Sequence, residues 1–383
     1  MSVNQVTREG ESATARVAIY LDPFSYHYLG DKIFAVNDPA HCNGDSVLAP
    51  YVYLRDYFAA RGIPVHTVDY LDGEPGDTRN VYVSFGMLEK YQQIARRRDT
   101  TVSAFFAVEC PIVEPSEYRA LREASRVFKR IFTWTDSRSL EPFVGVPLAC
   151  QRFYWPQAFD RVHEAIWNRT DRKFLVMINA NKLPRIYDRE LYTERLRAIA
   201  YFAQYDEIDL FGPGWNEPPI RVGRTWVPYT AKRLHRAGLR WWDLVHPDPA
   251  LVAARRVYRG IAASKSETVG QYTFALCFEN MILKGWITEK IFDCFYSGTV
   301  PIYWGDPEIE TIVPPNCYVD MRQFSGYPDL RAFLKSRTPD QIQAYREAAR
   351  AYLSSPQARP FTKDALVDIF RRIVKEDTGV DVA

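Results

Sequence analysis

The sequence predicts an α/β protein made of two Rossmann-like domains that face each other across a cleft. Short apolar stretches typical of buried strands alternate with helical stretches along most of the chain. This alternation loosens around Tyr154–Pro156 and then restarts, which places a domain boundary there. With 383 residues, the chain is also long enough for two ordinary domains, each with its own core.

The first half begins with a polar leader at residues 1–15, and residues 16–160 are assigned to the first domain. Val, Ile, Tyr and Phe dominate its expected strands, and Gly62 closes the first helix. The expected elements are a strand at Val17–Leu21, a helix at Tyr51–Arg61, and strands at Val65–Val68, Val81–Phe85 and Val102–Phe106. Alternation of this kind favours one parallel sheet covered by helices.

Residues 161–355 are assigned to the second domain, and residues 356–383 to a C-terminal helix and tail. The expected elements are a strand at Phe174–Ile178, a helix from Arg189 to about Ala203, a strand at Ile208–Phe211 and a strand–helix–strand unit within Tyr272–Asp306. The segment Glu217–Asp248 is rich in Arg, Trp and Pro but shows no clear period. We interpret it as an insertion near the pocket.

Composition excludes several classes of protein. A hydrophobic content of 47% with 14% aromatic residues excludes a disordered chain or a coiled coil. The net charge of +2 is too small to indicate nucleic acid as the main partner. Six cysteines without a CxxC pair fit reduced thiols better than a disulfide framework or a zinc site. No segment has the length of a membrane span or the apolar core of a signal peptide, so we expect a cytoplasmic protein.

Residues Tyr272–Asp306 contain the most informative helix start of the chain. Thr288 suits the N-cap, Glu289 and Lys290 occupy the first turn, and Gly298 ends the helix. The free N–H groups and the dipole of a helix N-terminus favour negative charge. A lysine there adds a positive charge for a diphosphate, and a glutamate accepts hydrogen bonds from sugar hydroxyls. The segment therefore predicts a pocket for a nucleotide sugar.

Three stretches of this segment resemble the C-terminal signature of the family-10 glycosyltransferases, the α-1,3/1,4-fucosyltransferases. They are FALCFEN at 274–280, GWITEKI at 285–291 and VPIYWG at 300–305. The resemblance implies a GT-B fold, with inverting transfer of fucose from GDP-fucose to a saccharide hydroxyl. Met281 stands where the family has a serine, and Trp286 where it has a tyrosine near the donor. Another GDP- or dTDP-sugar therefore remains an alternative for the donor.

In the family, the position of Glu289 binds the nucleotide ribose, and we expect Lys290 to contact the donor diphosphate. A solvated helix lysine is the plain alternative for Lys290. Glu279 follows a buried strand, where a carboxylate needs a partner, so a structural hydrogen bond to the next loop is as good an interpretation as ligand contact. The donor-binding residues assigned in this segment are Glu279, Asn280, Trp286, Thr288, Glu289 and Lys290.

The resemblance also implies an arginine near the start of the C-terminal domain that offsets the diphosphate charge. Arg185 and Arg189 are the candidates. Arg189 fits better, because Tyr192 and Leu196 then fall at the family's aromatic and leucine positions. A surface ion pair is the alternative for Arg189.

The general base is expected in the first domain. Residues 105–111, FFAVECP, resemble the family's acceptor-side segment, with Val108 in place of a glycine. Glu109 lies at the end of a buried strand, where partial desolvation raises the pKa of a carboxyl group toward a useful value. A loop-anchoring role is the alternative, and Glu114 and Glu117 are the fallback bases.

No cofactor and no required metal ion are expected, because the six histidines lack ligand spacing and no Asp-x-Asp clamp follows a strand. The expected partners are a nucleotide sugar and a saccharide acceptor, with oligomeric state left open. The C-terminal helix has apolar Ile369, Phe370 and Ile373 beside basic residues. Such helices mostly pack on a domain, but weak contact with an anionic bilayer is also allowed.

The resemblance favours a bacterial cytoplasmic enzyme, in peripheral contact with the inner membrane at most, that decorates glycans or lipopolysaccharide. A non-catalytic nucleotide- or carbohydrate-binding protein of the same fold is the alternative from another class.

Overall fold

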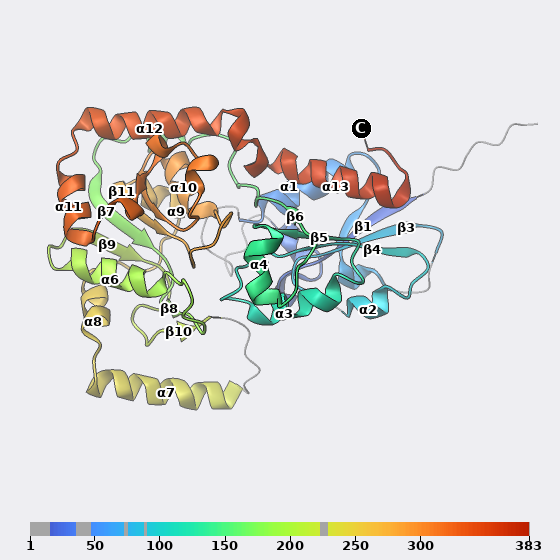
Figure 1. Cartoon of the computed structure of the whole chain (residues 1–383), viewed down its shortest axis with the longest axis horizontal. Helices are drawn as coiled ribbons and strands as arrows, with labels where there is room; N and C mark the ends of the chain where they lie inside the picture. The colour runs from blue at the N-terminus through green and yellow to red at the C-terminus, as the bar shows by residue number, and fades with distance from the viewer. Residues whose placement is uncertain (1–15, 36–46, 73–75, 88–89, 223–228, 383) are drawn as a thin grey trace, which may run out of the picture.

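The computed structural model describes residues 16–35, 47–72, 76–87, 90–222 and 229–382, and within 229–233 only the backbone. These residues form two α/β domains that lie side by side, each built on a parallel sheet (Figure 1). The expected fold class, two Rossmann-like domains in the GT-B arrangement, is confirmed by this topology.

The described strands of the N-terminal domain form a parallel six-stranded sheet in the order β2-β1-β3-β4-β5-β6. Its strands are β1 (Val17–Asp22), β2 (Val65–Thr67), β3 (Arg79–Ser84), β4 (Thr100–Phe106), β5 (Arg130–Thr133) and β6 (Gln151–Arg152). Its helices are α1 (Ala49–Ala59), α2 (Tyr91–Ile94), α3 (Pro115–Ala124) and α4 (Ser137–Val144). The expected strands are confirmed to within two residues, and α1 lies two residues earlier than expected.

The C-terminal domain has a parallel five-stranded sheet in the order β13-β12-β11-β7-β9, and a short parallel pair β10-β8 beside it. Its strands are β7 (Lys173–Ile178), β8 (Lys182–Leu183), β9 (Ile208–Phe211), β10 (Ile220–Arg221), β11 (Tyr272–Phe278), β12 (Val300–Trp304) and β13 (Val319–Asp320). Its helices are α5 (Glu164–Trp167), α6 (Tyr192–Ala203), α7 (Tyr229–Val245), α8 (Pro249–Arg256), α9 (Lys265–Val269), α10 (Glu289–Ser297), α11 (Tyr327–Lys335) and α12 (Pro339–Leu353).

The last helix, α13 (Lys363–Thr378), returns to the N-terminal domain after α12 and packs beside α1 (Figure 1). Phe370 is fully buried, and its ring centroid lies 5.9 Å from that of Phe106 in β4 and 6.5 Å from that of Phe58 in α1. Ile373 is also fully buried. The apolar face that allowed a bilayer contact is thus covered by the protein itself.

Two sequence expectations were wrong. The segment Glu217–Asp248 was expected to have no period, but it contains the 17-residue helix α7. Helix α6 begins at Tyr192 and not at Arg189, which has a left-handed backbone conformation with φ of 50°. No helix in the described part of the chain is both long enough and apolar enough to cross a membrane.

Candidate active site

A cleft of about 760 Å³ separates the two domains. It lies beyond the carboxyl ends of several strands, where ligands bind in sheets of this kind. Glu109 follows β4, Asn280 follows β11, and Gly212 follows β9. Gly212 has φ of 123°, and an added Cβ would lie 2.2 Å from the carbonyl oxygen of Asn179, so only glycine fits this wall. The cleft therefore contains residues from both halves of the sequence.

Six of the predicted site residues line this cleft together: Glu109, Asn280, Trp286, Thr288, Glu289 and Lys290. Glu114 and Glu117, the fallback bases, line it as well. The sequence thus selected residues far apart in the chain that the fold brings to one place. Their chemical roles stay predictions.

The start of α10 is held by a buried carboxylate. Glu279 is fully buried and accepts hydrogen bonds from the Thr288 backbone N–H at 2.9 Å and from the Thr288 hydroxyl at 2.7 Å. Lys290 Nζ donates to Glu279 Oε2 at 3.1 Å and to Thr288 Oγ1 at 2.8 Å. Thr288 is the N-cap residue, as expected, but its hydroxyl serves Glu279 and does not cap the first turn.

Glu279 itself does not line the cleft, so its geometry fits the structural alternative and not donor contact. The predicted donor contact is not supported for this residue, because its whole carboxylate is enclosed by the loop that it anchors. Its effect is to fix the direction of Lys290, which is 20% exposed and lines the cleft.

Glu289 lies between two lysines. Lys265, at the start of α9, is 3.4 Å from Glu289 Oε1 and 2.5 Å from Asp293 Oδ2, and Lys290 Nζ is 3.7 Å from Glu289 Oε1. Burial opposes ionisation, yet the charges of Lys290 and Lys265 hold the pKa of Glu289 well below its ordinary value. Glu289 is therefore an ionised hydrogen-bond acceptor whose side chain remains 45% exposed.

Glu109 lies across the cleft from α10. Its Oε1 accepts hydrogen bonds from the Cys110 backbone N–H at 2.9 Å and from Asn280 Nδ2 at 3.4 Å. The Tyr118 hydroxyl donates to the Glu109 carbonyl at 2.5 Å, which fixes the loop. Burial raises the pKa of the Glu109 carboxyl, although the Cys110 N–H and the charge of Lys290 oppose the rise. A carboxylate with these properties is suited to accept a proton.

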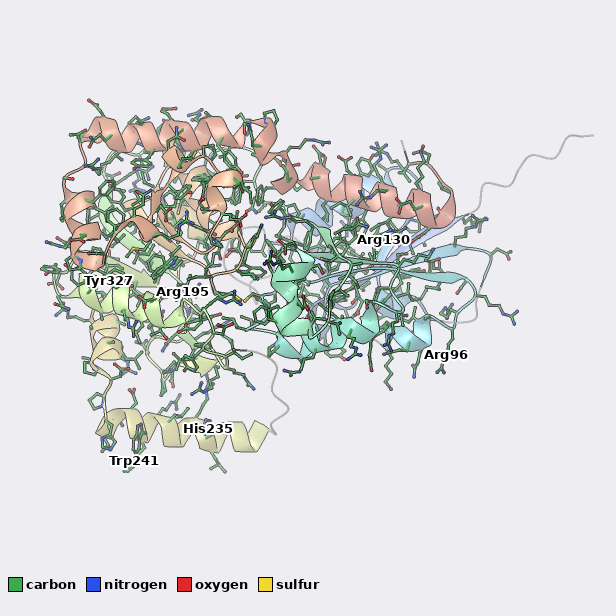
Figure 2. The ribbon with its side chains drawn as sticks, viewed as in Figure 1. Arg96, Arg130, Arg195, His235, Trp241 and Tyr327 are labelled. Carbon is green, nitrogen blue, oxygen red and sulfur yellow. The ribbon has the colours of Figure 1, made fainter. Side chains whose placement is uncertain are left out.

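Arg195 is a cleft residue that the sequence reasoning missed. It lies in α6, is 4% exposed, and donates to the Phe278 carbonyl at 2.6 Å and to Asn280 Oδ1 at 3.0 Å (Figure 2 labels it). In α6 it shares the buried stripe of Tyr192 and Ala198. The sequence could have indicated Arg195, because it is a cation on an otherwise apolar helix stripe and a buried charge requires partners.

The two arginines predicted for the diphosphate do not line the cleft. Arg185 Nε donates to the Val222 carbonyl at 2.7 Å. Arg189 is paired with the neighbouring Asp188 at 3.3 Å, and its guanidinium carbon lies 5.8 Å from the centroid of the Phe143 ring. The prediction assumed that the helix begins at Arg189, but its start at Tyr192 directs Arg195 and not Arg189 to the cleft.

Trp286 packs against Trp134 of the N-terminal domain, with ring centroids 4.6 Å apart. Both side chains line the cleft, and both indole nitrogens are buried without a hydrogen-bond partner in the part of the chain that the structure describes. Gly285 allows the two domains to meet here, because an added Cβ would lie 2.2 Å from the Trp134 carbonyl oxygen. Trp286 thus forms part of the domain contact.

The net character of the C-terminal wall is cationic. Lys182, Arg195, Lys265 and Lys290 line it together with Glu289, while Glu279 and Asp293 pair with Lys290 and Lys265 from behind the wall. The excess of positive charge favours an anionic ligand. Among the described residues, no group of three or more His, Cys, Asp or Glu side chains is arranged to hold a metal ion. That no metal is required stays a prediction.

Comparison with known proteins identifies one region of the chain. Residues 254–351 match the model of the glycosyltransferase family 10 (fucosyltransferase) C-terminal region. This match includes Asn280, α10, α11 and most of α12, and it confirms the resemblance to family-10 glycosyltransferases. The N-terminal wall with Glu109 lies outside the match.

Three curated proteins are similar to part of this chain. An alpha-(1,3)-fucosyltransferase FucT of Helicobacter pylori is 39% identical over 72 residues, which are 19% of this chain and 15% of the relative. An alpha-(1,4)-fucosyltransferase of Arabidopsis thaliana is 30% identical over 113 residues, 30% of this chain and 23% of the relative. Human alpha-(1,3)-fucosyltransferase 7 is 36% identical over 92 residues, 22% and 27% of the two chains. The matched regions span less than a third of each relative.

A crystal structure of an alpha1,3-fucosyltransferase with GDP covers 98% of this chain and 94% of its own, with 14% identity and a TM-score of 0.47. Because that TM-score is low, the fold rests on the sheet topology described above.

Proposed function

From the family-10 region at residues 254–351, we infer that this protein is an inverting glycosyltransferase that moves fucose from GDP-fucose to a saccharide hydroxyl. The observation that carries the proposal is the hydrogen bond across the cleft between Asn280, within the family-10 region, and Glu109 of the other domain. It places a carboxyl group of raised pKa opposite the cationic wall that begins at α10. A base and an anion site then face each other.

In the proposed reaction, the acceptor hydroxyl oxygen attacks the anomeric carbon of the donor sugar. The bond between that carbon and the diphosphate oxygen breaks, and GDP leaves with the electron pair. The proton of the acceptor hydroxyl passes to Glu109. General-base assistance of this kind contributes about 100- to 10,000-fold to a rate. The remaining acceleration comes from positioning and from stabilising the negative charge on GDP.

Lys290 and Arg195 are the proposed partners of the departing diphosphate, since both are held in fixed directions on the cationic wall. Arg195 takes the place that the sequence reasoning gave to Arg189. Glu289, ionised and half-exposed, is suited to accept hydrogen bonds from ribose hydroxyls. Trp286 stands where the family has a tyrosine, and its indole N–H is buried beside Trp134, so we assign that N–H no contact with the sugar donor.

The test is Glu109→Gln, with Glu114→Gln as the matched control from the same wall of the cleft. GDP release is measured with GDP-fucose and a panel of saccharide acceptors, and GDP binding by titration calorimetry. We expect Glu109→Gln to lose turnover by about 100-fold or more while GDP affinity stays unchanged. Near-normal transfer by Glu109→Gln, or an equal loss in Glu114→Gln, would remove Glu109 from the role of base.

A transferase with another GDP- or dTDP-sugar donor is the second candidate, favoured by Trp286 in place of the family's tyrosine. Thermal-shift measurements with a panel of nucleotides and nucleotide sugars distinguish the donors. A non-catalytic binding protein would bind GDP but show neither transfer nor slow donor hydrolysis. The proposed acceptor is a glycan, such as a lipopolysaccharide chain, in a bacterial cytoplasm.

A further inference from the structure

Helix α7 is amphipathic, but its apolar side faces away from the protein. Its exposed apolar side chains are Leu234 (75% exposed), Trp241 (64%), Trp242 (57%), Leu244 (81%) and Val245 (49%). Leu234, Trp241 and Val245 recur at intervals of seven and four residues, which places them on one side of a helix. Figure 2 shows Trp241 on α7 at the edge of the molecule, away from both sheets.

The polar side of α7 is the side that contacts the domain. Arg240 pairs with Glu217 at 2.6 Å, and Asp243 forms an ion pair with Arg255 of α8. Asp243 is partly buried, in contrast to its apolar neighbours. Surface helices normally bury their apolar stripe against the core and expose their charges. In α7 the charged side packs on the domain and the apolar side is exposed. The apolar stripe is therefore available to a partner outside this domain.

The charge of the surrounding segment indicates what that occupant is. Residues 220–259 contain nine lysines and arginines against two aspartates, in a chain whose net charge is only +2. Four of the arginines are paired with Asp206, Asp209, Glu217 and Asp243, and the other five basic residues against Asp248 leave the segment cationic. A second copy of the chain would bring an equally basic segment to the same place and be repelled. One helix face is also small beside the roughly 1,200–2,000 Å² that stable protein interfaces bury. An anionic bilayer attracts the charge and accepts the apolar stripe.

We propose that α7 lies in the surface of an anionic membrane, with Leu234, Trp241 and Leu244 among the acyl chains. Paired tryptophans suit the interface, because their amphipathic rings locate at headgroup level. Helix α7 is too short and too charged to span a bilayer, so it lies on the membrane. The membrane contact that the sequence suggested for α13 is thus reassigned to α7. The inference does not depend on the proposed sugar transfer.

The test uses the full chain and sedimentation with vesicles of phosphatidylglycerol and phosphatidylcholine, or of phosphatidylcholine alone. We expect binding to the anionic vesicles, weakened by salt. Trp241→Ser with Leu244→Ser should lower the partition coefficient by about tenfold or more, because each side chain loses its apolar contact. Leu234→Ser alone should lower it in the same direction. These positions face solvent, so the melting temperature should not change.

Two variants serve as controls. Tyr70→Ser removes a side chain of similar exposure, 52%, from the N-terminal domain and should leave vesicle binding unchanged. Ile369→Ser tests α13 and should also have no effect. The proposal is overturned if the unsubstituted protein fails to bind anionic vesicles. It is also overturned if the Trp241→Ser, Leu244→Ser double variant binds these vesicles as tightly as the unsubstituted protein. Conversion of a dimer to a monomer by the double variant, seen by light scattering, would also overturn it, because the stripe would then belong to a second copy.

Discussion

Replacing Glu279 by glutamine tests whether this residue anchors the α10 helix start. The fully buried carboxylate accepts hydrogen bonds from the Thr288 N–H, the Thr288 hydroxyl and Lys290 Nζ. Glutamine keeps the shape and one oxygen acceptor, but it removes the charge that pairs with Lys290 and presents an NH₂ group to two donors. We therefore expect Glu279→Gln to destabilise the C-terminal domain.

The expected loss is about 2–3 kcal/mol in the free energy of unfolding. Removing one partner of a fully buried ion pair costs roughly 3–5 kcal/mol. The smaller loss of about 2–3 kcal/mol is expected here because the Lys290 side chain is 20% exposed and its Nζ remains 3.7 Å from Glu289 Oε1. For a domain of this size, 2–3 kcal/mol corresponds to a fall in melting temperature of roughly 5–10 °C.

Scanning calorimetry measures the effect, and Glu310→Gln is the matched control. Glu310 pairs with Arg322 at 2.8 Å, but its side chain is 49% exposed, so this substitution should cost about 0–1 kcal/mol. Lys290→Met should cost more than Glu279→Gln, because it leaves the less exposed partner unpaired. The double variant should be more stable than Lys290→Met alone. Equal melting temperatures for Glu279→Gln and the unsubstituted protein would refute the anchoring role.

Four further outcomes are expected. Burial raises the pKa of Glu109, and a general base must be ionised to accept a proton. The value of kcat/KM should therefore fall as the pH decreases, with a midpoint above the ordinary glutamate pKa of about 4.3. A midpoint at or below that value would contradict the burial argument. Arg195→Gln should weaken GDP binding by about tenfold in calorimetry, whereas Arg189→Gln should not, and the reverse order would restore the original assignment. Lys290→Ala should also weaken GDP binding about tenfold or more, and unchanged affinity would remove it from the pocket. Phe370→Ala should destabilise the N-terminal domain by about 3–5 kcal/mol, seen as a lower melting temperature, and a negligible change would show that α13 adds little to that core.

Much of the fold was predictable because its local signals agree. The strands at residues 17–22, 173–178 and 208–211 are short and apolar, as parallel strands covered on both faces must be. Thr288 and Gly298 marked the ends of α10 correctly. The structureless interpretation of Glu217–Asp248 was wrong although Leu234, Trp241 and Val245 have helical spacing, because the prolines that flank α7 and Gly238 within it are loop signals.

The candidate site was predictable where residues follow strand ends, as Glu109 and Asn280 do. Parallel topology alone brings such residues to one edge of a sheet. Arg189 lies outside the cleft although it was expected inside, because its assignment required the exact start of α6 and helix boundaries are poorly defined by local sequence. The partner that Glu279 would choose was also not predictable, since its bonds to Thr288 and Lys290 depend on the loop between β11 and α10.

The return of α13 has a consequence for the order in which the chain folds. The aromatic cluster around Phe106 is completed by Phe370, near the end of the chain. The core of the N-terminal domain is therefore complete only when α13 has been made, and α13 follows all strands of the C-terminal sheet in the chain. We expect removal of α13 to destabilise the N-terminal domain, although that domain lies far from α13 in the sequence.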